Sequence, residues 1–457
     1  MSIPSAISDL VLLLGDRLTQ SPSDLDLHGR SESYFAPRPP DAVAYPETTK
    51  EVASLVRICA EHDCPVIGFG TGTSLEAQTL ALSGGVSVDF SRMNSVVEVS
   101  PEDMTVRVQP GITREALNTE LRATGLFFPV DPGANASIGG MAATRASGTT
   151  AVRYGTMRDN VLGLEVVLAD GRTIRTGTAA PKSSAGYDLT GLMVGSEGTL
   201  GLITELTLRL QGQPEAISSA VCAFDAIGDA VNAVIETIQI GLPMARIEFL
   251  DTETVAAVNA HSGLTLEESP QLLVEFHGSP SGVEEQVKTF GDIIADHGGK
   301  GFEWATKAED RSALWTARHN AYYAILASRP GARAVVTDMC VPISRLAEAI
   351  EETRADIAAS SIPGPILGHV GDGNFHAILM LEENNQDELK TAKELAQRMA
   401  ERALRLGGTI TGEHGVGAGK MPLMPAEHGD AWNVMAEIKR TLDPQNIMNP
   451  GKMVQIN

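Results

Sequence analysis

Cysteines are scarce in this chain of 457 residues, and long apolar runs are missing. The cysteine spacing matches no zinc-binding motif and indicates no disulfide framework, so we expect a reducing compartment. The four cysteines are Cys59, Cys64, Cys222 and Cys340. No apolar stretch approaches the ~20 residues of a membrane-spanning helix, and no basic segment typical of a signal peptide precedes one. We therefore expect neither a transmembrane helix nor a signal peptide.

Basic residues are also few: 35 Lys and Arg stand against 58 Asp and Glu, which gives a net charge of −23. Such an acidic surface argues against unaided nucleic-acid binding, because it repels phosphates. Hydrophobic residues make up 43% and charged residues 20% of the chain, which excludes a disordered protein. The length exceeds what one hydrophobic core supports, so we expect two or three domains.

The N-terminal part of the chain, residues 1–40, is polar and ends in a proline-rich stretch at 37–40. This composition predicts an extended entry segment. An amphipathic helix is expected next, capped by Thr48 or Thr49, because apolar residues recur there at helical spacing. Its buried face is predicted to consist of Val52, Leu55, Val56 and Cys59.

Short strands are predicted on both sides of a second helix. That helix spans 113–124 and is ended by Gly125. A hairpin is expected around Asp170-Gly171, a strong turn sequence. The chain changes character near residue 212, beyond which strands alternate with long helices, and the clearest of these helices covers 390–406. Strands are predicted at 65–67, 86–90, 96–99, 105–109, 163–168, 173–175, 198–210, 220–224, 245–250 and 271–277.

The segment 68–74 is rich in glycine and follows the predicted strand at 65–67. Glycines there let backbone N–H groups approach a pyrophosphate closely, and a helix is expected after the loop. A Rossmann dinucleotide turn is one alternative, because Asp89 stands about 20 residues further on. However, Thr73 occupies the place of its third glycine. A plain tight turn is the other alternative.

Two further glycine-rich stretches lie in the same part of the chain, at 133–155 and 195–201. Such segments offer backbone amides and small side chains at close range, and they can wrap a large planar ligand. Three stretches within one domain are hard to explain by turns alone. They favour a phosphate-bearing ligand for this domain.

The sharpest chemical signal is the pair His369 and His376, which flank Asp372-Gly373. Asp-Gly is a strong two-residue hairpin turn, and a hairpin closed there pairs the two histidines directly. Their Cβ atoms would then lie ~5 Å apart, which suits two imidazoles on one divalent metal. Two unrelated histidines beside a turn are the alternative.

Glu413 and His414 lie between glycines and supply further groups. A carboxylate beside two imidazoles completes a metal site with open positions for substrate, and the glycines permit the backbone to aim both side chains at one pocket. His414 is then a candidate general base. Arg318, on a predicted helix, is a candidate clamp for a carboxylate. A structural histidine and a surface salt bridge are the alternatives for these two residues.

Taken in order along the chain, these motifs resemble the FAD-linked D-lactate dehydrogenases of the cytochrome-reducing type, within the vanillyl-alcohol-oxidase-like flavoproteins. The resemblance covers residues 35–455. Its most specific stretches are 70–76, 127–148, 151–161, 195–201, 369–376, 412–415 and 443–451.

The resemblance implies an α+β protein, in which a two-subdomain PCMH-type FAD-binding domain precedes an α+β substrate (cap) domain with an antiparallel sheet. The implied parts are an N-terminal segment at 1–37, the FAD-binding domain at 38–212, and the C-terminal substrate and metal domain at 213–457. FAD is expected to be noncovalent, because no histidine stands at a flavin-linking position. The implied FAD-binding residues are Gly70, Thr71, Gly72, Thr73, Ser74, Pro132, Gly133, Gly139, Gly140, Ser147, Gly148, Tyr154, Gly155, Glu197, Gly198, Gly201, Ile203 and Asn449.

The same resemblance implies the chemistry. His369, His376 and Glu413 match the family's metal ligands, His414 its base and Arg318 its substrate-carboxylate clamp. The implied reaction is the oxidation of a D-2-hydroxy acid by hydride transfer to flavin N5, with D-lactate to pyruvate favoured. D-2-hydroxyglutarate and glycolate are the alternative substrates. The metal is left open between zinc, manganese and iron.

Two positions depart from the family pattern. Gln78 stands where some relatives carry a histidine, and Val336 stands where relatives specific for D-2-hydroxyglutarate carry a lysine. The missing cation favours a monocarboxylate with a small or apolar tail.

Several partners and some other functions remain open at this point. Cytochrome c, a quinone and an electron-transfer flavoprotein all suit the electron-acceptor role, and a homodimer is left open. The expected location is the cytoplasm, with a peripheral position at the inner membrane as the alternative. Functions of a different class are a metal-dependent hydrolase, a nicotinamide-dependent dehydrogenase and a flavin-binding module without activity.

Overall fold

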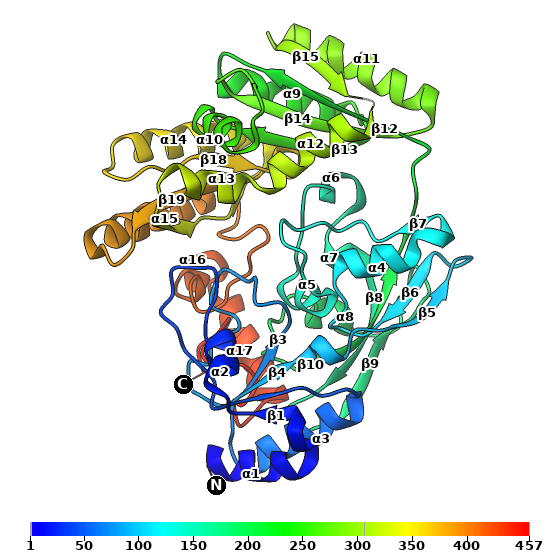
Figure 1. Cartoon of the computed structure of the whole chain (residues 1–457), viewed down its shortest axis with the longest axis vertical. Helices are drawn as coiled ribbons and strands as arrows, with labels where there is room; N and C mark the ends of the chain where they lie inside the picture. Colours follow the sequence, from blue (N-terminus) through cyan, green and yellow to red (C-terminus); the bar gives the residue numbers. More distant parts are fainter. Residues whose placement is uncertain (1, 306, 457) are drawn as a thin grey trace. The chain divides into compact units, whose positions relative to one another are not determined.

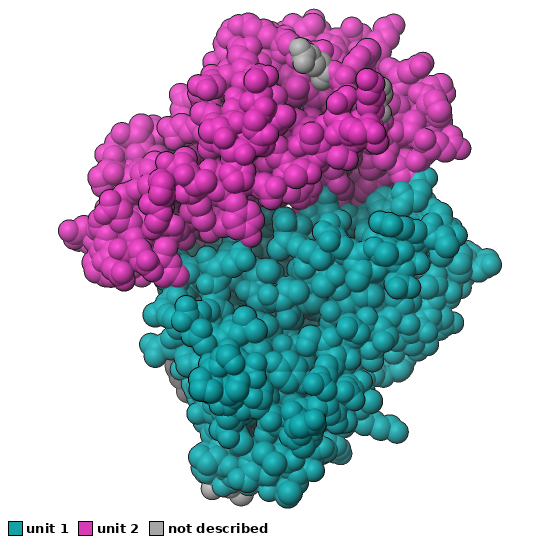
Figure 2. All heavy atoms as spheres, viewed as in Figure 1, with its two compact units in different colours: residues 1–147, 155–213, 413–457 teal, residues 148–154, 214–412 magenta. Residues whose placement is uncertain are grey.

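The computed structural model describes residues 2–305 and 307–456, leaving aside the side chain of Glu303. The chain forms two compact units, coloured separately in Figure 2. The first unit holds the chain up to 147, then 155–213, and again from 413 onward, while the second holds 148–154 and 214–412. The residues from 413 onward thus lie in the first unit, although they follow the second unit in the sequence.

A four-stranded sheet forms one half of the first unit (Figure 1). Its order is β1-β2-β4-β3; the last three strands run parallel, and β1 is antiparallel to β2. Helix α3 (Thr49–Glu61) is the predicted amphipathic helix, and Thr48 caps it by accepting a hydrogen bond from the backbone of Glu51. The strands are β1 (Leu18–Thr19), β2 (Ala42–Ala44), β3 (Val66–Phe69) and β4 (Val86–Asp89).

Two α-helices lie within residues 3–28, so the prediction of an extended segment is wrong for that part, while the proline-rich stretch at 37–40 holds no helix. Helix α1 (Ile3–Leu14) packs on α3, and α2 (Pro22–His28) ends at a buried histidine whose ring bonds to Asp89. The prediction followed the polar residues and the prolines, and it missed the apolar residues at helical spacing. The residues that α1 buries are Ala6, Ile7, Leu10 and Leu14.

The second half of the first unit is a five-stranded, fully antiparallel sheet in the order β5-β6-β10-β8-β9. The predicted hairpin at Asp170-Gly171 is confirmed as the β8–β9 pair. Two sheets with their own helices confirm the expected pair of α+β subdomains. The strands are β5 (Val96–Ser100), β6 (Thr105–Val108), β8 (Val161–Val167), β9 (Thr173–Gly177) and β10 (Leu202–Arg209). The shorter elements are α4 (Arg114–Leu121), β7 (Leu126–Phe127), α5 (Ile138–Thr144), α7 (Met157–Asn160), α8 (Leu189–Met193) and β11 (Gln211–Gly212).

The second unit is built on one large antiparallel sheet, in the order β15-β12-β14-β13-β18-β19-β16, with β17 paired to β19. This confirms the expected antiparallel sheet of the substrate domain. The strands are β12 (Ala216–Ala223), β13 (Met244–Leu250), β14 (Gln271–Gly278), β15 (Lys300–Ala305), β16 (Ala332–Val336), β17 (Met339–Cys340), β18 (Ile366–Gly368) and β19 (Asn374–Glu382).

Helices pack on this sheet along its whole width. In Figure 1, α11 accompanies β12 and β14, and α15 accompanies β19, while α12 and α13 contact β15, β16 and β19. Helix α15 covers the predicted helix at 390–406 except for its last residue, Leu406, which is the C-cap. An apolar cluster around Leu250, Trp315 and Leu367 joins α12 to the sheet. The helices are α6 (Ala151–Tyr154), α9 (Ile227–Gln239), α10 (Thr252–Ser262), α11 (Pro280–Asp296), α12 (Ala308–His319), α13 (Ala321–Ser328), α14 (Leu346–Ala358) and α15 (Gln386–Arg405).

The C-terminal part of the chain completes the first unit. It forms α16 (Met424–His428) and α17 (Asp430–Leu442), and then pairs with β3 through the backbone of 447–449. Lys439 of α17 is buried, and its Nζ donates to the carbonyls of Thr199 and Met448 and to the carboxylate of Asp443. This ammonium group therefore joins three segments of the first unit.

Candidate functional site

The first glycine loop approaches the second one closely in the first unit. A Cβ at Gly70 would lie 2.1 Å from Oγ of Ser137, the residue at the N-terminus of α5. The hydroxyls of Ser74 and Ser137 are both buried and have no hydrogen-bond partner among the described residues. Unpartnered buried hydroxyls beside a glycine cradle suit the phosphate oxygens of a dinucleotide, because each leaves a donor to be satisfied. No helix follows the loop at 68–74, so that part of the prediction is wrong.

Gly139 lies directly against the backbone of Pro110, to whose carbonyl its own N–H donates at 2.8 Å. A Cβ at this position would lie 2.4 Å from Cβ of Pro110 and 3.0 Å from its carbonyl oxygen. A Gly139→Ala substitution must therefore push the start of α5 away from its place beside the loop at 68–74. We expect Gly139→Ala to weaken binding of FAD, the predicted cofactor, by about 10-fold or more, as measured by titrating the apoprotein with FAD.

Gly212→Ala is the matched control for this prediction, because a Cβ at Gly212 meets no atom within 4 Å. The control should bind FAD as the wild-type chain does. Equal FAD affinity in a folded Gly139→Ala protein would remove the start of α5 from the cofactor site.

Glu197 and Asn449, both predicted FAD contacts, join segments of the first unit to one another. The Glu197 carboxylate accepts hydrogen bonds from the backbone N–H of Val416 (2.7 Å) and of Gly417 (2.8 Å). The Asn449 amide donates to the carbonyls of Gln78 (3.0 Å) and Glu197 (2.7 Å). Burial raises the pKa of Glu197, although the two backbone N–H groups oppose this shift. Both side chains therefore form hydrogen bonds within the protein. Contacts to a ligand in this region would come from the backbone of the neighbouring glycines.

His369 and His376 come together in the second unit, with ring centroids 5.6 Å apart and planes at 82°. The predicted hairpin register is nevertheless wrong. His376 is paired with Leu367, and His369 stands beyond the end of β18, before a short 3₁₀ turn at 370–372. Close packing of Gly371 on Ile247 and Val152 explains this turn, because a Cβ there would lie within 2.7 Å of both side chains. A longer connection thus brings the rings together without direct strand pairing.

Hydrogen bonds fix which nitrogen of each ring carries the proton. His376 Nδ1 lies 3.0 Å from the carbonyl oxygen of Thr337, and His369 Nδ1 lies 2.7 Å from Oε1 of Glu248. A carbonyl and an ionised carboxylate can only accept, so both Nδ1 atoms must donate. Each neutral ring then keeps its lone pair on Nε2, the nitrogen that a metal ion would bind.

Arg318 lies on α12, as predicted, but its guanidinium is not free. Its Nη2 donates to Oε2 of Glu248 at 2.5 Å, and only 7% of the residue is exposed. Its Nε is buried and has no partner among the described residues. Burial alone would raise the pKa of Glu248, but the neighbouring His369 and Arg318 outweigh it and lower the pKa. The arginine therefore keeps a donor for a further anion.

The segment that leads to Glu413 is anchored in the second unit by Asp338. The Asp338 carboxylate accepts from Oγ1 of Thr411 (2.7 Å) and from the side-chain amide of Asn374 (2.8 Å). Gly412 packs against Asn374 and Asp338: a Cβ added at Gly412 would lie 2.2 Å from the Asn374 amide nitrogen and 3.1 Å from Oδ1 of Asp338. Glu413 is the next residue along the chain, so its Cα lies about 3.8 Å from that of Gly412.

Glu413 and His414 themselves are the first residues of the returning segment. The His414 Nε2 lies 3.9 Å from Oε1 of Glu413, and the side chain of Gln78 donates to the carbonyl oxygen of His414 at 2.8 Å. Gln78, which departs from the family pattern, therefore holds the backbone of the candidate base.

Two polar residues of this region were missed by the sequence analysis, namely Glu248 and Asp338. Both are buried, with exposures of 0% and 1%. A charged residue inside an otherwise apolar strand is a signal for a buried functional group. Arg246 and Glu248, which alternate with apolar residues within 245–250, are an example of this signal. The partners of these residues lie far away in the sequence and become visible only in the fold.

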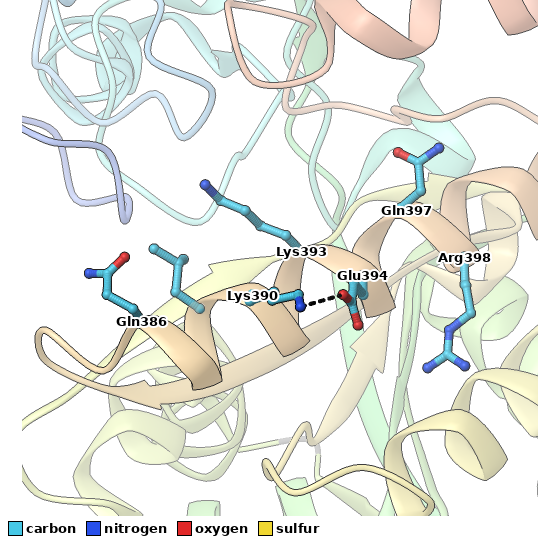
Figure 3. Close-up of a pocket in the computed structure, with 7 residues that line it drawn as sticks. Gln386, Lys390, Lys393, Glu394, Gln397 and Arg398 are labelled. Atoms are coloured by element: carbon cyan, nitrogen blue, oxygen red, sulfur yellow. Dashed lines mark ion pairs between the residues drawn. The ribbon is translucent and has the colours of Figure 1, made fainter.

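A surface hollow on α15, drawn in Figure 3, is separate from these residues. Six polar or charged side chains and one leucine of that helix line it, and none of the predicted site residues is among them. It therefore carries no candidate chemistry. Its lining residues are Gln386, Leu389, Lys390, Lys393, Glu394, Gln397 and Arg398.

Known proteins match both parts of the chain. The family model for "FAD linked oxidases, C-terminal domain" matches residues 213–453, and the model for "FAD binding domain" matches residues 40–177. A curated relative from Danio rerio, "Probable D-lactate dehydrogenase, mitochondrial", is 52% identical over 94% of this chain and 87% of the relative. The "D-lactate dehydrogenase (cytochrome), mitochondrial" of Arabidopsis thaliana is 45% identical over 98% of this chain and 80% of the relative.

Solved structures support the fold class. p-Cresol methylhydroxylase with substrate bound aligns with a TM-score of 0.82 at 18% identity, covering 98% of this chain and 96% of that chain. Alkyldihydroxyacetonephosphate synthase aligns with a TM-score of 0.79 at 21% identity, covering 99% of this chain and 86% of that chain. At these identities the likeness concerns the fold, and it confirms the predicted PCMH-type architecture. Within the described residues, no helix has the length and hydropathy that crossing a bilayer requires.

Proposed function

Because the chain belongs to the FAD-linked oxidases, and is thus a flavin-dependent oxidoreductase, we propose that it oxidises a D-2-hydroxy acid, D-lactate in the first place, to the 2-oxo acid. The observation that carries this proposal is the near full-length identity of 52% and 45% to proteins named D-lactate dehydrogenase. An external acceptor would then take the electrons, and a cytochrome is the acceptor that the second name indicates.

The residues around the first glycine loop suit FAD. Buried, unpartnered hydroxyls at Ser74 and Ser137 can donate to its phosphates, and Gly70 and Gly139 allow the backbone to come close. When bound, FAD supplies the acceptor for the hydride that leaves the substrate carbon. The protein's own contribution is to hold and orient the two reactants.

Arg318 is the residue we assign to the substrate carboxylate. One nitrogen is held by Glu248, and the buried Nε still needs a partner. A buried guanidinium next to a single carboxylate has donors to spare for a second anion, which it can grip through more than one N–H. Val336, on β16, is uncharged. A cation at this position would favour a substrate with a second carboxylate, and valine does not supply one.

His369, His376 and Glu413 are the residues we assign to a divalent metal. Both Nδ1 atoms are committed as donors, so both Nε2 atoms can ligate, and the anchored segment 411–412 carries Glu413. Two imidazoles and one carboxylate are a common ligand set for zinc, manganese or iron. When bound, such a cation would polarise the substrate hydroxyl. His414, the next residue, would accept the proton from that hydroxyl.

An anaerobic absorbance titration tests the proposed function. We expect D-lactate, and not L-lactate, to bleach the visible flavin band of the purified protein, and elemental analysis to find a divalent metal in it. Bleaching by D-2-hydroxyglutarate or glycolate alone would contradict the choice of D-lactate within the same reaction class. A flavin band that none of these acids bleaches would contradict the reaction itself.

A further inference from the structure

We propose that Glu248 is a positioning residue that holds the substrate-carboxylate clamp Arg318 and the metal-ligating imidazole of His369 in one fixed arrangement. The inference rests on the proposed function and goes beyond it, because it assigns a role to a residue that touches neither substrate nor metal. It also makes binding of the metal and binding of the substrate carboxylate depend on the same side chain.

Glu248 occupies the middle of β13, where a charge has no access to water. It lies between Ile247 and Phe249, is paired with Leu273 of β14, and has no exposed surface. Burying a carboxylate is strongly unfavourable unless charged or polar partners satisfy it. A buried carboxylate in a central strand is therefore best explained by a role that an apolar side chain could not fill.

The two oxygens of Glu248 have separate partners from distant parts of the chain. Oε2 accepts from Arg318 of α12 at 2.5 Å, and Oε1 accepts from His369 at 2.7 Å. The carboxylate is rigid, so the position of the arginine fixes the position of the imidazole and the reverse. The remaining donors of Arg318 and the Nε2 of His369 are thereby held at a set separation.

Glu248 also determines the protonation of His369. An ionised carboxylate accepts only, so it requires a proton on Nδ1 and leaves the lone pair on Nε2. His376 does not depend on Glu248, because the carbonyl oxygen of Thr337 accepts the hydrogen bond from its Nδ1. Loss of Glu248 should therefore damage one of the two imidazole ligands and spare the other.

A second carboxylate–histidine pair on the same sheet provides the comparison. Oε1 of Glu275, on β14, lies 2.9 Å from Nε2 of His277. Glu275 is buried, as Glu248 is. However, the other ring nitrogen of His277 bonds to the hydroxyl of Tyr154 at 2.7 Å. This imidazole has both nitrogens engaged by protein groups, so Glu275 serves no ligand-binding nitrogen.

The test compares Glu248→Gln with Glu275→Gln in the FAD-loaded protein. A glutamine at 248 has one acceptor oxygen, and its NH₂ group must face a donor on the other side. It therefore either forces the proton of His369 onto Nε2 or repels Arg318. We expect Glu248→Gln to bind Zn²⁺ or Mn²⁺ 10- to 100-fold more weakly in equilibrium dialysis. We also expect at least a 10-fold higher KM for D-lactate, with FAD content unchanged.

The outcomes separate this inference from the proposed function. Glu275→Gln should keep the metal and D-lactate affinities of the wild-type protein. Because the amide can turn its NH₂ group toward either partner, unchanged affinity of Glu248→Gln for both the metal and D-lactate would overturn the inference. A wild-type protein that binds no metal and ignores D-lactate would instead overturn the proposed function, and the inference with it.

A second variant covers the case in which Glu248→Gln does not fold. Glu248→Asp keeps the charge but is one methylene shorter, so its carboxylate cannot reach both Arg318 and His369. We expect it to lose affinity for the metal and for D-lactate together. Loss of neither in this folded variant would again overturn the inference.

Discussion

A His414→Ala variant is expected to reduce its flavin with D-lactate at least ~10²-fold more slowly than the wild-type protein, while FAD stays bound. The substitution removes the group assigned to accept the substrate's hydroxyl proton. It leaves the local backbone in place, because Gln78 donates to the carbonyl oxygen of residue 414 and not to its ring. Anaerobic stopped-flow measurement of the flavin band gives the rate directly, and added imidazole should restore part of it.

His428→Ala is the control for this experiment. His428 lies in the same C-terminal segment, at the end of α16, and faces Glu427 at 3.8 Å near the surface. Its replacement should leave the rate of flavin reduction unchanged. A His414→Ala protein with full FAD content and wild-type reduction rate would show that another group accepts the proton.

A Lys439→Ala variant is expected to lose ~3–5 kcal/mol of unfolding free energy. The substitution strips a buried carboxylate of its only ion-pair partner among the described residues, and it leaves the carbonyls of Thr199 and Met448 without this donor. Asp443 would keep its bonds from the backbone of 447 and 448 but not its counter-charge. The melting temperature of the first unit, followed by release of flavin fluorescence, should fall by roughly 10 °C.

Lys390→Ala tests whether burial, and not the ion pair as such, decides the effect. Lys390 and Glu394 have the same i, i+4 spacing, but their side chains are exposed, with Nζ 3.9 Å from Oε1. Figure 3 marks this pair on α15 with a dashed line. Surface pairs of this kind contribute little, because water screens them. Equal destabilisation by the two substitutions would contradict the importance assigned to the buried site.

The elements that the sequence predicted well are those with strong local signals. Helix α3 follows from a capping threonine and apolar residues at helical spacing, and the β8–β9 hairpin follows from Asp170-Gly171. Each signal lies within a short stretch of sequence, so it can be recognised without knowledge of the fold. The N-terminal helix α1 carried a similar signal, which the prolines and polar residues concealed.

The connection between the two histidines shows where local signals stop. Asp372-Gly373 does form a turn, but the 3₁₀ segment before it adds residues that a two-residue hairpin does not have. That segment is fixed by the packing of Gly371 on Ile247 and Val152, which lie more than a hundred residues away. The prediction of neighbouring histidines was right for the rings and wrong for the register.

Glu248 marks the limit of sequence reasoning for the candidate site. Its partners Arg318 and His369 stand 70 and 121 residues further along the chain. A buried charge in a strand can be suspected from the pattern of 245–250, but nothing local identifies what it binds. Residues that act through another residue are therefore found by their contacts and not by a motif.

The return of the chain to the first unit has a consequence for biosynthesis. The free side of β3 is filled by the backbone of 447–449, which the ribosome makes only after all of 214–412. The second unit is continuous over that range, so nearly all of its residues emerge before the first unit can close. Domains generally fold as they appear. For this chain the order differs: the first unit gains its last segment, 413–457, only after the residues of 214–412 have been made.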